Sequence, residues 1–488
     1  MKPEIRNFLH VIGAASVVIA AADGLHAAEI TQSGDVYFRQ AQAALTERLA
    51  IRPIDSRARN VIVFIADGSG VASNTAIRIA AGQQRGETGE ENVLAYEAFP
   101  HLGLVKTYST NAQIPDSAST ATAILSGVKT SNGVIGVGQV VPAGDCALAL
   151  AHPVATLGEL AEARGMATGI VTTARLTHAT PAAFYAHAAN RNWEDDGLLP
   201  SGSPCKDIAR QLIEFPFEVA MGGGRQHFLP SGSSYIEDGA GLRGDGRDLM
   251  AEWRALGPGR AVVQSRAEFD SLAGDLPERV LGLFSPSHMA FEVDRPLDRS
   301  GEPSLAEMTR MAIEILSRDP DGFVLLVEAG RIDHAYHAID LHRAVTDGIA
   351  LNEAVRVAAT MTDAADTLII VTSDHTDPMP SWGHDPRGAP VVDFHGWSAA
   401  DHPPPPDRLA PRAPGSVIPD MTGLAKAIVS TVFDAEPPVL PPAGPGSHGP
   451  ADVAIYARGP MAYLIGGTVE QHYIFHVISH ALGFDAAD

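Results

Sequence analysis

Four short stretches of the chain consist almost entirely of apolar and β-branched residues, and they constrain its fold more than any other feature. They are Val61–Ala66 (VIVFIA), Thr168–Thr173 (TGIVTT), Phe323–Val327 (FVLLV) and Leu368–Ser373 (LIIVTS). Their apolar residues run continuously rather than alternating, which is typical of strands buried on both faces. Because parallel strands need long crossovers, the segments between them should contain helices.

Helical patterns do lie between these stretches, at Thr156–Arg164, Leu305–Ser317 and Leu341–Met361, and one more precedes them at Val36–Leu49. Strands that alternate with helices predict an α/β fold with a large central, mostly parallel sheet flanked by helices on both faces. With 488 residues, of which 45% are hydrophobic, the chain can bury a sizeable core.

The formal net charge of −23 argues against general binding to nucleic acid or anionic membranes, which requires basic patches. Part of the acidic excess is available to bind cations. Residues 1–28 resemble a secretory signal peptide, with Lys2 and Arg6 before the apolar run Phe8–Ala22 and a small-residue cleavage site near Ala28. The alternative, a membrane anchor, is disfavoured because the run is short for a span of about 20 residues. We therefore expect a periplasmic or secreted protein without membrane contact after cleavage, with residues 29–488 as its catalytic domain.

The two cysteines, Cys146 and Cys205, suggest a disulfide in an exported protein, although two unrelated buried thiols remain the alternative. From residue 383 to residue 446 the chain is rich in proline and is interrupted by one short helical pattern, Met421–Val432. This variable insertion is either a tolerated surface loop or a lid or interface element near the site, and the sequence favours neither.

Residues able to bind metal ions follow each of the four predicted strands. Asp67 follows the first, Glu328 ends the third, and Asp374 with His375 follows the fourth. His178 and Thr180 come soon after the second. Because the carboxyl ends of parallel strands are where sites assemble, these side chains are expected to converge.

Two further segments complete three sets of ligands. Asp333 and His337 are four residues apart, so on a helix they share one face and can chelate a cation, while His334 points elsewhere. His448 offers a third ligand. The predicted zinc sets are Asp333, His337 and His448, and Asp67, Asp374 and His375; the oxygen-only set Asp67, Thr180 and Glu328 suits magnesium.

Ser117 either caps a helix or acts as a nucleophile. Asp116 and Ser117 are good cap residues before the helical stretch 118–125. The carboxylates of the three sets offset only part of the charge of three divalent ions, and the remaining positive charge suits a phosphate monoester dianion. Beside such ions the serine hydroxyl ionises and can attack phosphorus to form a phosphoserine. Arg191 could hold two phosphoryl oxygens, although alone it would be taken as a surface charge.

At these residues the sequence resembles the alkaline phosphatase family. The matching segments are VIVFIADGSG, PDSASTATAILSGVKT, GIVTTARLTHATPAAFYAHAANRNW, GGGR at 222–225, VEAGRIDHAYH, VTSDHTD and HGPADVAIYARGPMAYLIGGTVEQHYIFHVI. They follow the family's order over residues 60–482. The resemblance implies a homodimeric phosphomonoesterase with two zinc ions and one magnesium ion. It assigns Ser117 as nucleophile, Arg191 as phosphate clamp and the three ligand sets above, and it supports a disulfide between Cys146 and Cys205.

The chain departs from the best-known bacterial pattern at His178 and His334, where that form has Asp and Lys. The pair resembles the animal pattern, so zinc or cobalt could compete with magnesium at the third site. The family's animal members also carry a calcium site, whose ligands are not matched in residues 283–296, where Ser285 stands in place of an acid. No calcium is predicted.

Three other classes were weighed. A phosphodiesterase or nucleotide pyrophosphatase of the same superfamily commonly uses threonine as nucleophile and lacks the third metal, and Ser117, Glu328, Thr180 and Arg191 favour the monoesterase. A sulfatase needs a modifiable residue in a short Pro/Arg motif, which neither cysteine has. An exported metal- or phosphate-binding protein without turnover is disfavoured by the intact Ser117.

Overall fold

The computed structural model describes residues 30–233, 240–299, 301–378, 387–392 and 448–484. The predicted signal segment lies outside these ranges, as does most of the proline-rich stretch with its expected helix at 421–432. Contacts divide the chain into residues 1–52 and 53–488, and each unit is described by itself.

In the first unit, helix α1 spans Val36–Ala50, close to the predicted 36–49. The side chain of Asp35 caps it by accepting hydrogen bonds from the backbone N–H groups of Tyr37 and Phe38. Every residue of α1 is at least partly exposed within the structure.

The second unit is built on one ten-stranded sheet with the order β10-β2-β9-β8-β1-β7-β3-β4-β6-β5. The strands are β1 (Asn60–Ile65), β2 (His101–Lys106), β3 (Ala167–Arg175), β4 (Val219–Gly223), β5 (Arg260–Val263), β6 (Arg279–Leu283), β7 (Phe323–Glu328), β8 (Thr367–Thr372), β9 (Val453–Arg458) and β10 (Gly467–Glu470). All neighbouring strands pair in parallel except β9, which runs antiparallel to both β2 and β8. The predicted mostly parallel α/β sheet is confirmed.

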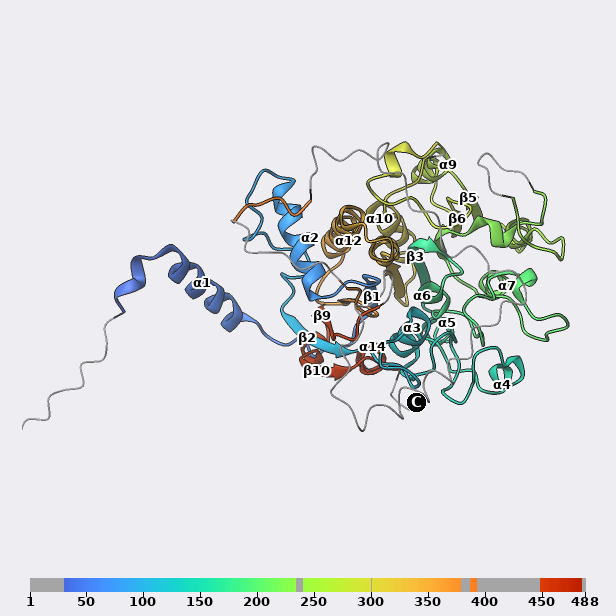
Figure 1. Cartoon of the computed structure of the whole chain (residues 1–488), viewed down its shortest axis with the longest axis horizontal. Coiled ribbons are helices and arrows are strands. Elements are labelled where there is room, and N and C mark those ends of the chain that lie inside the picture. The colour runs from blue at the N-terminus through green and yellow to red at the C-terminus, as the bar shows by residue number, and fades with distance from the viewer. Residues whose placement is uncertain (1–29, 234–239, 300, 379–386, 393–447, 485–488) are drawn as a thin grey trace, which may run out of the picture. The chain divides into compact units, whose positions relative to one another are not determined.

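Helices cover both faces of this sheet, as Figure 1 shows. The helices of the second unit are α2 (Val71–Gln83), α3 (Ser117–Ser126), α4 (Cys146–Ala151), α5 (Leu157–Glu162), α6 (Ala179–Ala182), α7 (Ile208–Glu214), α8 (Leu249–Ala255), α9 (Arg266–Ser271), α10 (Leu305–Leu316), α11 (Arg331–His337), α12 (Leu341–Met361) and α14 (Tyr473–Leu482). The predicted helix 341–361 is confirmed at both ends. None of the helices in the described ranges has the length and apolar character that a membrane span requires.

Alternate residues of β1 point to opposite faces of the sheet and enter different cores. Val61, Val63 and Ile65 pack in the cluster that includes residues of α3, α5 and α14. Ile62 and Phe64 pack in the cluster that includes residues of α2, α10 and α12. Two-sided burial explains why β1 is continuously apolar in sequence. It also fixes the carboxyl end of β1 in the middle of the molecule's second unit.

Candidate active site

Four neighbouring strands in the middle of the sheet, β8, β1, β7 and β3, carry the predicted ligands at their carboxyl ends. In the β1–β7 register Ile65 lies opposite Glu328, and in the β1–β8 register it lies opposite Thr372. Asp67 therefore leaves the sheet between Glu328 on one side and Asp374 on the other. The expected convergence at one edge follows directly from this strand order.

Ser117 is the first residue of α3, and Asp116 caps that helix. One Asp116 oxygen accepts a hydrogen bond from the Ser119 N–H at 3.1 Å, and the other accepts from Gly133 N–H at 3.0 Å. The Ser117 side chain is not used as the cap. Its Oγ lies 3.1 Å from Nε2 of His375, and both residues are buried. The cap and the free hydroxyl therefore belong to different residues.

Asp67, Asp374 and His375 form the first ligand group, with one ligand atom from each within 4.8 Å of the others. Nε2 of His375 lies 3.4 Å from Asp67 Oδ1 and 3.3 Å from Asp374 Oδ2. Neither oxygen of Asp67 accepts a hydrogen bond within the described residues, although the side chain is fully buried. Burial, together with the charges of Asp374 and Asp333, raises the pKa of Asp67 well above its usual range. Such a carboxylate fits a bound cation.

Asp333, His337 and His448 form the second group. Asp333 and His337 lie one turn apart on α11, with Nε2 of His337 3.1 Å from Asp333 Oδ1. His448 comes from the far end of the chain, and its Nε2 lies 3.2 Å from Nε2 of His337. Nδ1 of His448 contacts the carbonyl oxygen of Pro115 at 2.7 Å. Because a carbonyl only accepts, Nδ1 carries the proton and Nε2 offers its lone pair to a cation.

A fourth residue, Asp377, joins this second group, and sequence reasoning did not assign it. It lies within the matching segment VTSDHTD, two residues after His375. The signal that could have found it is its acidic character beside two assigned ligands.

Asp67 also belongs to the third group. Asp67, His178 and Glu328 lie within 4.8 Å of one another through one ligand atom each. Glu328 accepts a hydrogen bond from the Thr172 hydroxyl on β3, and the Thr180 hydroxyl also faces it. Burial, with the charges of Asp374 and Asp333, raises the pKa of Glu328 to about 7. The group contains Asp67 and Glu328 of the predicted oxygen-only site, and His178 adds a nitrogen atom nearby.

Arg191 is held between two residues beside these ligand groups. Its Nη1 donates to Asp116 Oδ2 at 3.0 Å, and its Nη2 lies 3.1 Å from Nε2 of His178. Asp116 thus connects the guanidinium to the helix that begins with Ser117. Arg191 is therefore a partly buried, hydrogen-bonded group and not the isolated surface charge that its sequence position alone suggests.

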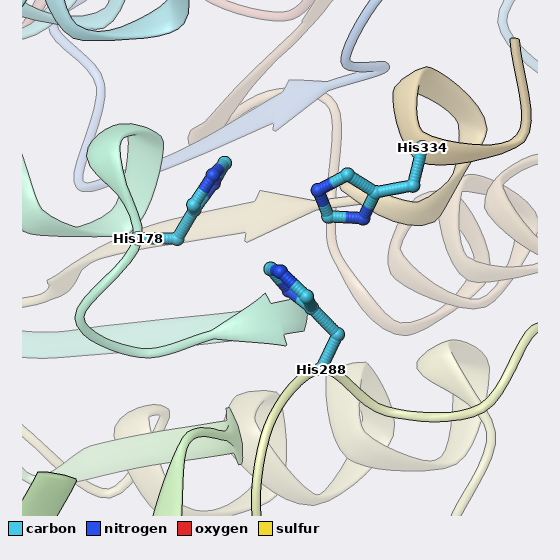
Figure 2. Close-up of side chains that lie close together, drawn as sticks. All are labelled: His178, His288 and His334. Atoms are coloured by element: carbon cyan, nitrogen blue, oxygen red, sulfur yellow. The ribbon is translucent and has the colours of Figure 1, made fainter. Parts of the chain in front are cut away.

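His178 and His334 face a third histidine, His288, which the sequence analysis did not assign (Figure 2). The ring centroids lie 5.3 Å apart for His178–His288 and 4.1 Å apart for His288–His334. Nε2 of His288 lies 2.6 Å from a guanidinium nitrogen of Arg175. Burial and nearby arginines lower the pKa of both His178 and His288 well below the usual range, so both rings are neutral. The segment 283–296, in which no calcium ligands are matched, thus contributes an imidazole to this cluster.

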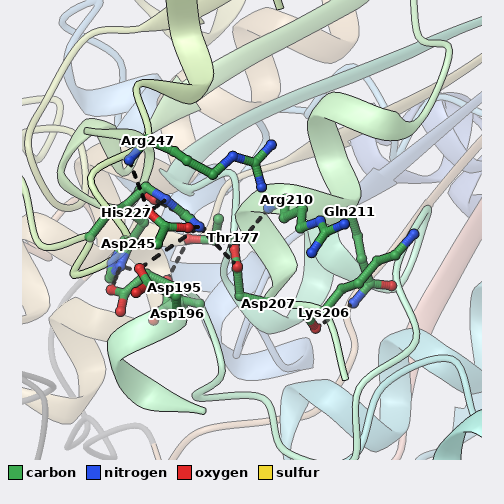
Figure 3. Close-up of polar contacts among 12 residues, drawn as sticks. Thr177, Asp195, Asp196, Lys206, Asp207, Arg210, Gln211, His227, Asp245 and Arg247 are labelled. Carbon is green, nitrogen blue, oxygen red and sulfur yellow. Dashed lines mark hydrogen bonds and ion pairs between the residues drawn. The ribbon is translucent and has the colours of Figure 1, made fainter. Parts of the chain in front are cut away.

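A buried network of ion pairs holds Arg175, which contacts the ring of His288. Arg175 donates two hydrogen bonds to Glu194, each 2.8 Å long. His227 lies 2.6 Å from Asp195 (Figure 3). It also lies 3.4 Å from Glu194. Although burial alone would raise it, the charges of Arg175 and His227 hold the pKa of Glu194 well below its usual range. Because the charges are mutually compensated, the network serves as rigid support for Arg175.

Cys146 and Cys205 form a disulfide with a Cα–Cα distance of 5.8 Å, as predicted. The loop that it closes spans 59 positions and includes Thr180 and Arg191.

The fold and the converging ligand groups define a metal-dependent hydrolase. A model of the alkaline phosphatase family matches residues 58–484, and the chain belongs to that family. The tissue-nonspecific alkaline phosphatase isozyme of Gallus gallus is 41% identical over 467 residues, covering 91% of this chain and 89% of the relative. The protein is accordingly a phosphomonoesterase.

Solved structures agree. Alkaline phosphatase from Thermus thermophilus superposes with a TM-score of 0.67 at 27% identity, covering 92% of this chain and 95% of that chain. Alkaline phosphatase from the Antarctic bacterium TAB5 gives a TM-score of 0.62 at 25% identity, covering 88% of this chain and 100% of that chain.

Proposed function

We propose that the protein hydrolyses phosphate monoesters through a phosphoserine intermediate on Ser117, at a centre of two zinc ions and one magnesium ion. The observation that carries this proposal is the position of the Ser117 hydroxyl, buried and 3.1 Å from Nε2 of His375. His375 belongs to a ligand group that shares Asp67 with the third group. A nucleophile in contact with one ligand group, which itself shares Asp67 with a second group, fits metal-assisted phosphoryl transfer.

Asp67, Asp374 and His375 would hold one zinc ion, and Asp333, His337 and His448 the other. Asp67, Thr180 and Glu328 would hold magnesium. When bound, these cations supply the positive charge that favours ionised oxygen nucleophiles and stabilises phosphoryl oxygens.

The chain's own groups determine the course of the reaction. Ser117 gives up its hydroxyl proton, and its Oγ forms a bond to phosphorus as the bond between phosphorus and the substrate's ester oxygen breaks. That oxygen takes up a proton, and the alcohol leaves. Water then attacks the phosphorus of the phosphoserine. Ser117 regains its hydroxyl proton and inorganic phosphate leaves. The N–H groups of Ser117 and Ala118, at the start of α3, have no carbonyl partner within the helix, so they can orient phosphoryl oxygens together with Arg191.

Because of His178, the identity of the metal at the third site depends on competition between magnesium and zinc or cobalt. Its ligand atom lies within 4.8 Å of those of Asp67 and Glu328, and a nitrogen donor favours zinc or cobalt over magnesium. A structure of the TAB5 enzyme in which a histidine is replaced by aspartate is described with Mg bound in the M3 site. This supports magnesium as the ion of an all-oxygen third site, with zinc or cobalt as competitors in this chain.

Export to the periplasm or secretion, a homodimeric state and the absence of membrane contact after signal cleavage stay predictions. The disulfide supports an oxidising compartment.

One assay tests the proposed function. Hydrolysis rates are measured on a phosphate monoester and a diester with the same leaving group, and zinc and magnesium are quantified in the same sample. We expect the monoester to be strongly preferred, with bound zinc in excess of magnesium. A preference for the diester, or full monoester turnover in a metal-free sample, would contradict the proposal.

A further inference from the structure

Asp377 is a buried acid next to the second ligand group. Asp377 is only 6% exposed, and neither of its carboxylate oxygens accepts a hydrogen bond from any described residue. A buried carboxylate without donors is strongly destabilising unless a proton or a cation compensates for it. The buried carboxylate of Asp377 must therefore be compensated by a proton or by a cation.

The backbone of Asp377 is fixed by two separate segments. Its N–H donates to the carbonyl oxygen of Gly68 at 2.9 Å, which ties it to the loop after β1. The preceding residue, Thr376, forms an antiparallel bridge with Gly449, which ties it to the loop that carries His448. The carboxylate is thus positioned by the same two loops that position Asp67 and His448.

Gly68 leaves space for this carboxylate. Its φ angle is +76°, and a Cβ atom built there would lie 2.3 Å from Asp377 Oδ2 and 3.1 Å from the Cα of Asp333. A side chain at position 68 would therefore occupy the volume that the Asp377 carboxylate fills. The need for glycine at this position and the presence of Asp377 are two aspects of one packing arrangement.

The groups that surround Asp377 are metal ligands. One ligand atom from each of Asp333, His337, Asp377 and His448 lies within 4.8 Å of the other three. Two imidazoles and two carboxylates form a donor set that zinc accepts. A cation between the carboxylates of Asp333 and Asp377 would neutralise both.

We propose that Asp377 is a fourth protein ligand of the cation bound by Asp333, His337 and His448. This rests on the proposed function only in that those three residues hold a cation. With Asp377 included, this cation site carries one more negative charge than the three predicted ligands supply. The added charge binds the cation more tightly and weakens the attraction of the site for inorganic phosphate.

The first experiment introduces a cysteine at position 377 as a possible metal ligand. Cys146 and Cys205 are paired, so Asp377→Cys introduces the single free thiol. A thiolate bound to Co²⁺ gives a near-ultraviolet charge-transfer band, whereas a thiol that merely lies nearby does not. The full-length protein is reconstituted with Co²⁺, and Asp275→Cys, at an exposed acid, serves as the matched control. We expect the band in Asp377→Cys only. Stoichiometric cobalt without the band would overturn the proposal.

The second experiment measures zinc release from the holoenzyme to a chromogenic chelator. Asp377→Asn keeps the shape of the side chain, but it cannot act as an anionic ligand. We expect one zinc ion per chain to leave at least about tenfold faster than in the wild type and in Asp275→Asn. Equal release would mean that Asp377 shares a proton with Asp333 and would overturn the proposal. If the wild type itself retains no zinc, the proposed function is contradicted. If the wild type retains zinc and Asp377→Asn releases it equally fast, only the role of Asp377 is contradicted.

Discussion

The hydroxyl oxygen of Ser117 lies 3.1 Å from Nε2 of His375, although the two residues are 258 positions apart. His375 in turn stacks on His448 with ring centroids 3.6 Å apart. His448 donates through Nδ1 to the carbonyl oxygen of Pro115, two residues before Ser117. These contacts form a closed ring of three segments, so the position of the hydroxyl depends on both histidines.

This arrangement predicts that Ser117→Ala abolishes the phosphoenzyme. Without the Oγ atom no phosphoserine can form, and turnover should fall by about four orders of magnitude or more, as when nucleophiles are removed from other hydrolases. The measurement is acid quenching with a radiolabelled monoester, together with steady-state rates. Ser126→Ala, at the far end of the same helix, is the control because its hydroxyl bonds only locally, donating to the Thr122 carbonyl oxygen and accepting from the Val128 N–H. Near-normal turnover in Ser117→Ala would exclude the serine as nucleophile.

Removal of metal should affect stability as well as activity. Asp67, Glu328, Asp333 and Asp374 are all buried, and their mutual repulsion is uncompensated without cations. A chelator should therefore lower the melting temperature and abolish turnover, and zinc should restore both. An unchanged melting temperature after verified metal removal would show that protons alone compensate these carboxylates.

Much of the sheet could be predicted because its central strands are buried on both faces. β1, β3, β7 and β8 were found within a few residues because two-sided burial requires continuous apolar sequence. β2 was not found, since Leu102 and Leu104 are exposed and only its alternate residues are buried. β4 and β6 were missed because the glycines in VAMGG and RVLGL weaken the strand pattern.

The ligand groups were predictable for a related reason: each acid follows a recognisable strand. His288 and Asp377 could not be found by that rule. His288 lies in the segment after β6, which was not recognised as a strand, and its role depends on rings from two other segments. Asp377 lies beyond the expected ligand pair, and the backbone bond to Gly68 together with the bridge between Thr376 and Gly449 positions it beside Asp333.

His178→Asp should shift the third site towards magnesium. The substitution replaces an imidazole by an oxygen donor near Asp67 and Glu328, and magnesium prefers oxygen ligands. The measurement is activity and metal content after dialysis against mixtures of Mg²⁺ with Zn²⁺ or Co²⁺. His152→Asp makes the same chemical change at an exposed position. Unchanged metal dependence would count against a role for His178 at this site.

Loss of the disulfide should destabilise the second unit. Cys146→Ser combined with Cys205→Ser opens a loop of 59 positions, which lowers the free energy of unfolding by about 2–4 kcal/mol. Denaturant unfolding of the double variant measures the change. Because the chain has no other cysteine, treatment of the wild type with a reductant should give the same loss.

Glu162 predicts a pH-dependent stability change away from the active site. Its Oε1 accepts a hydrogen bond of 2.5 Å from the Thr168 hydroxyl, and Glu218 accepts from the N–H of the same residue. Burial, reinforced by the charge of Glu218, raises the pKa of Glu162 to about 7. The folded state therefore keeps a proton that the unfolded chain releases near its ordinary value. Stability from this group is complete below that value and is lost as the pH rises through about 7.

Glu162→Gln removes this dependence because the amide stays neutral and can still accept from Thr168. At about pH 8 the variant should be more stable than the wild type by roughly 1–2 kcal/mol, a figure reduced for partial solvent exposure, whereas at about pH 4 the two should agree. Melting temperatures at both pH values measure the effect, with Glu314→Gln on the exposed face of α10 as the control. A gain of the same size at both pH values would mean that packing, rather than ionisation of Glu162, causes it.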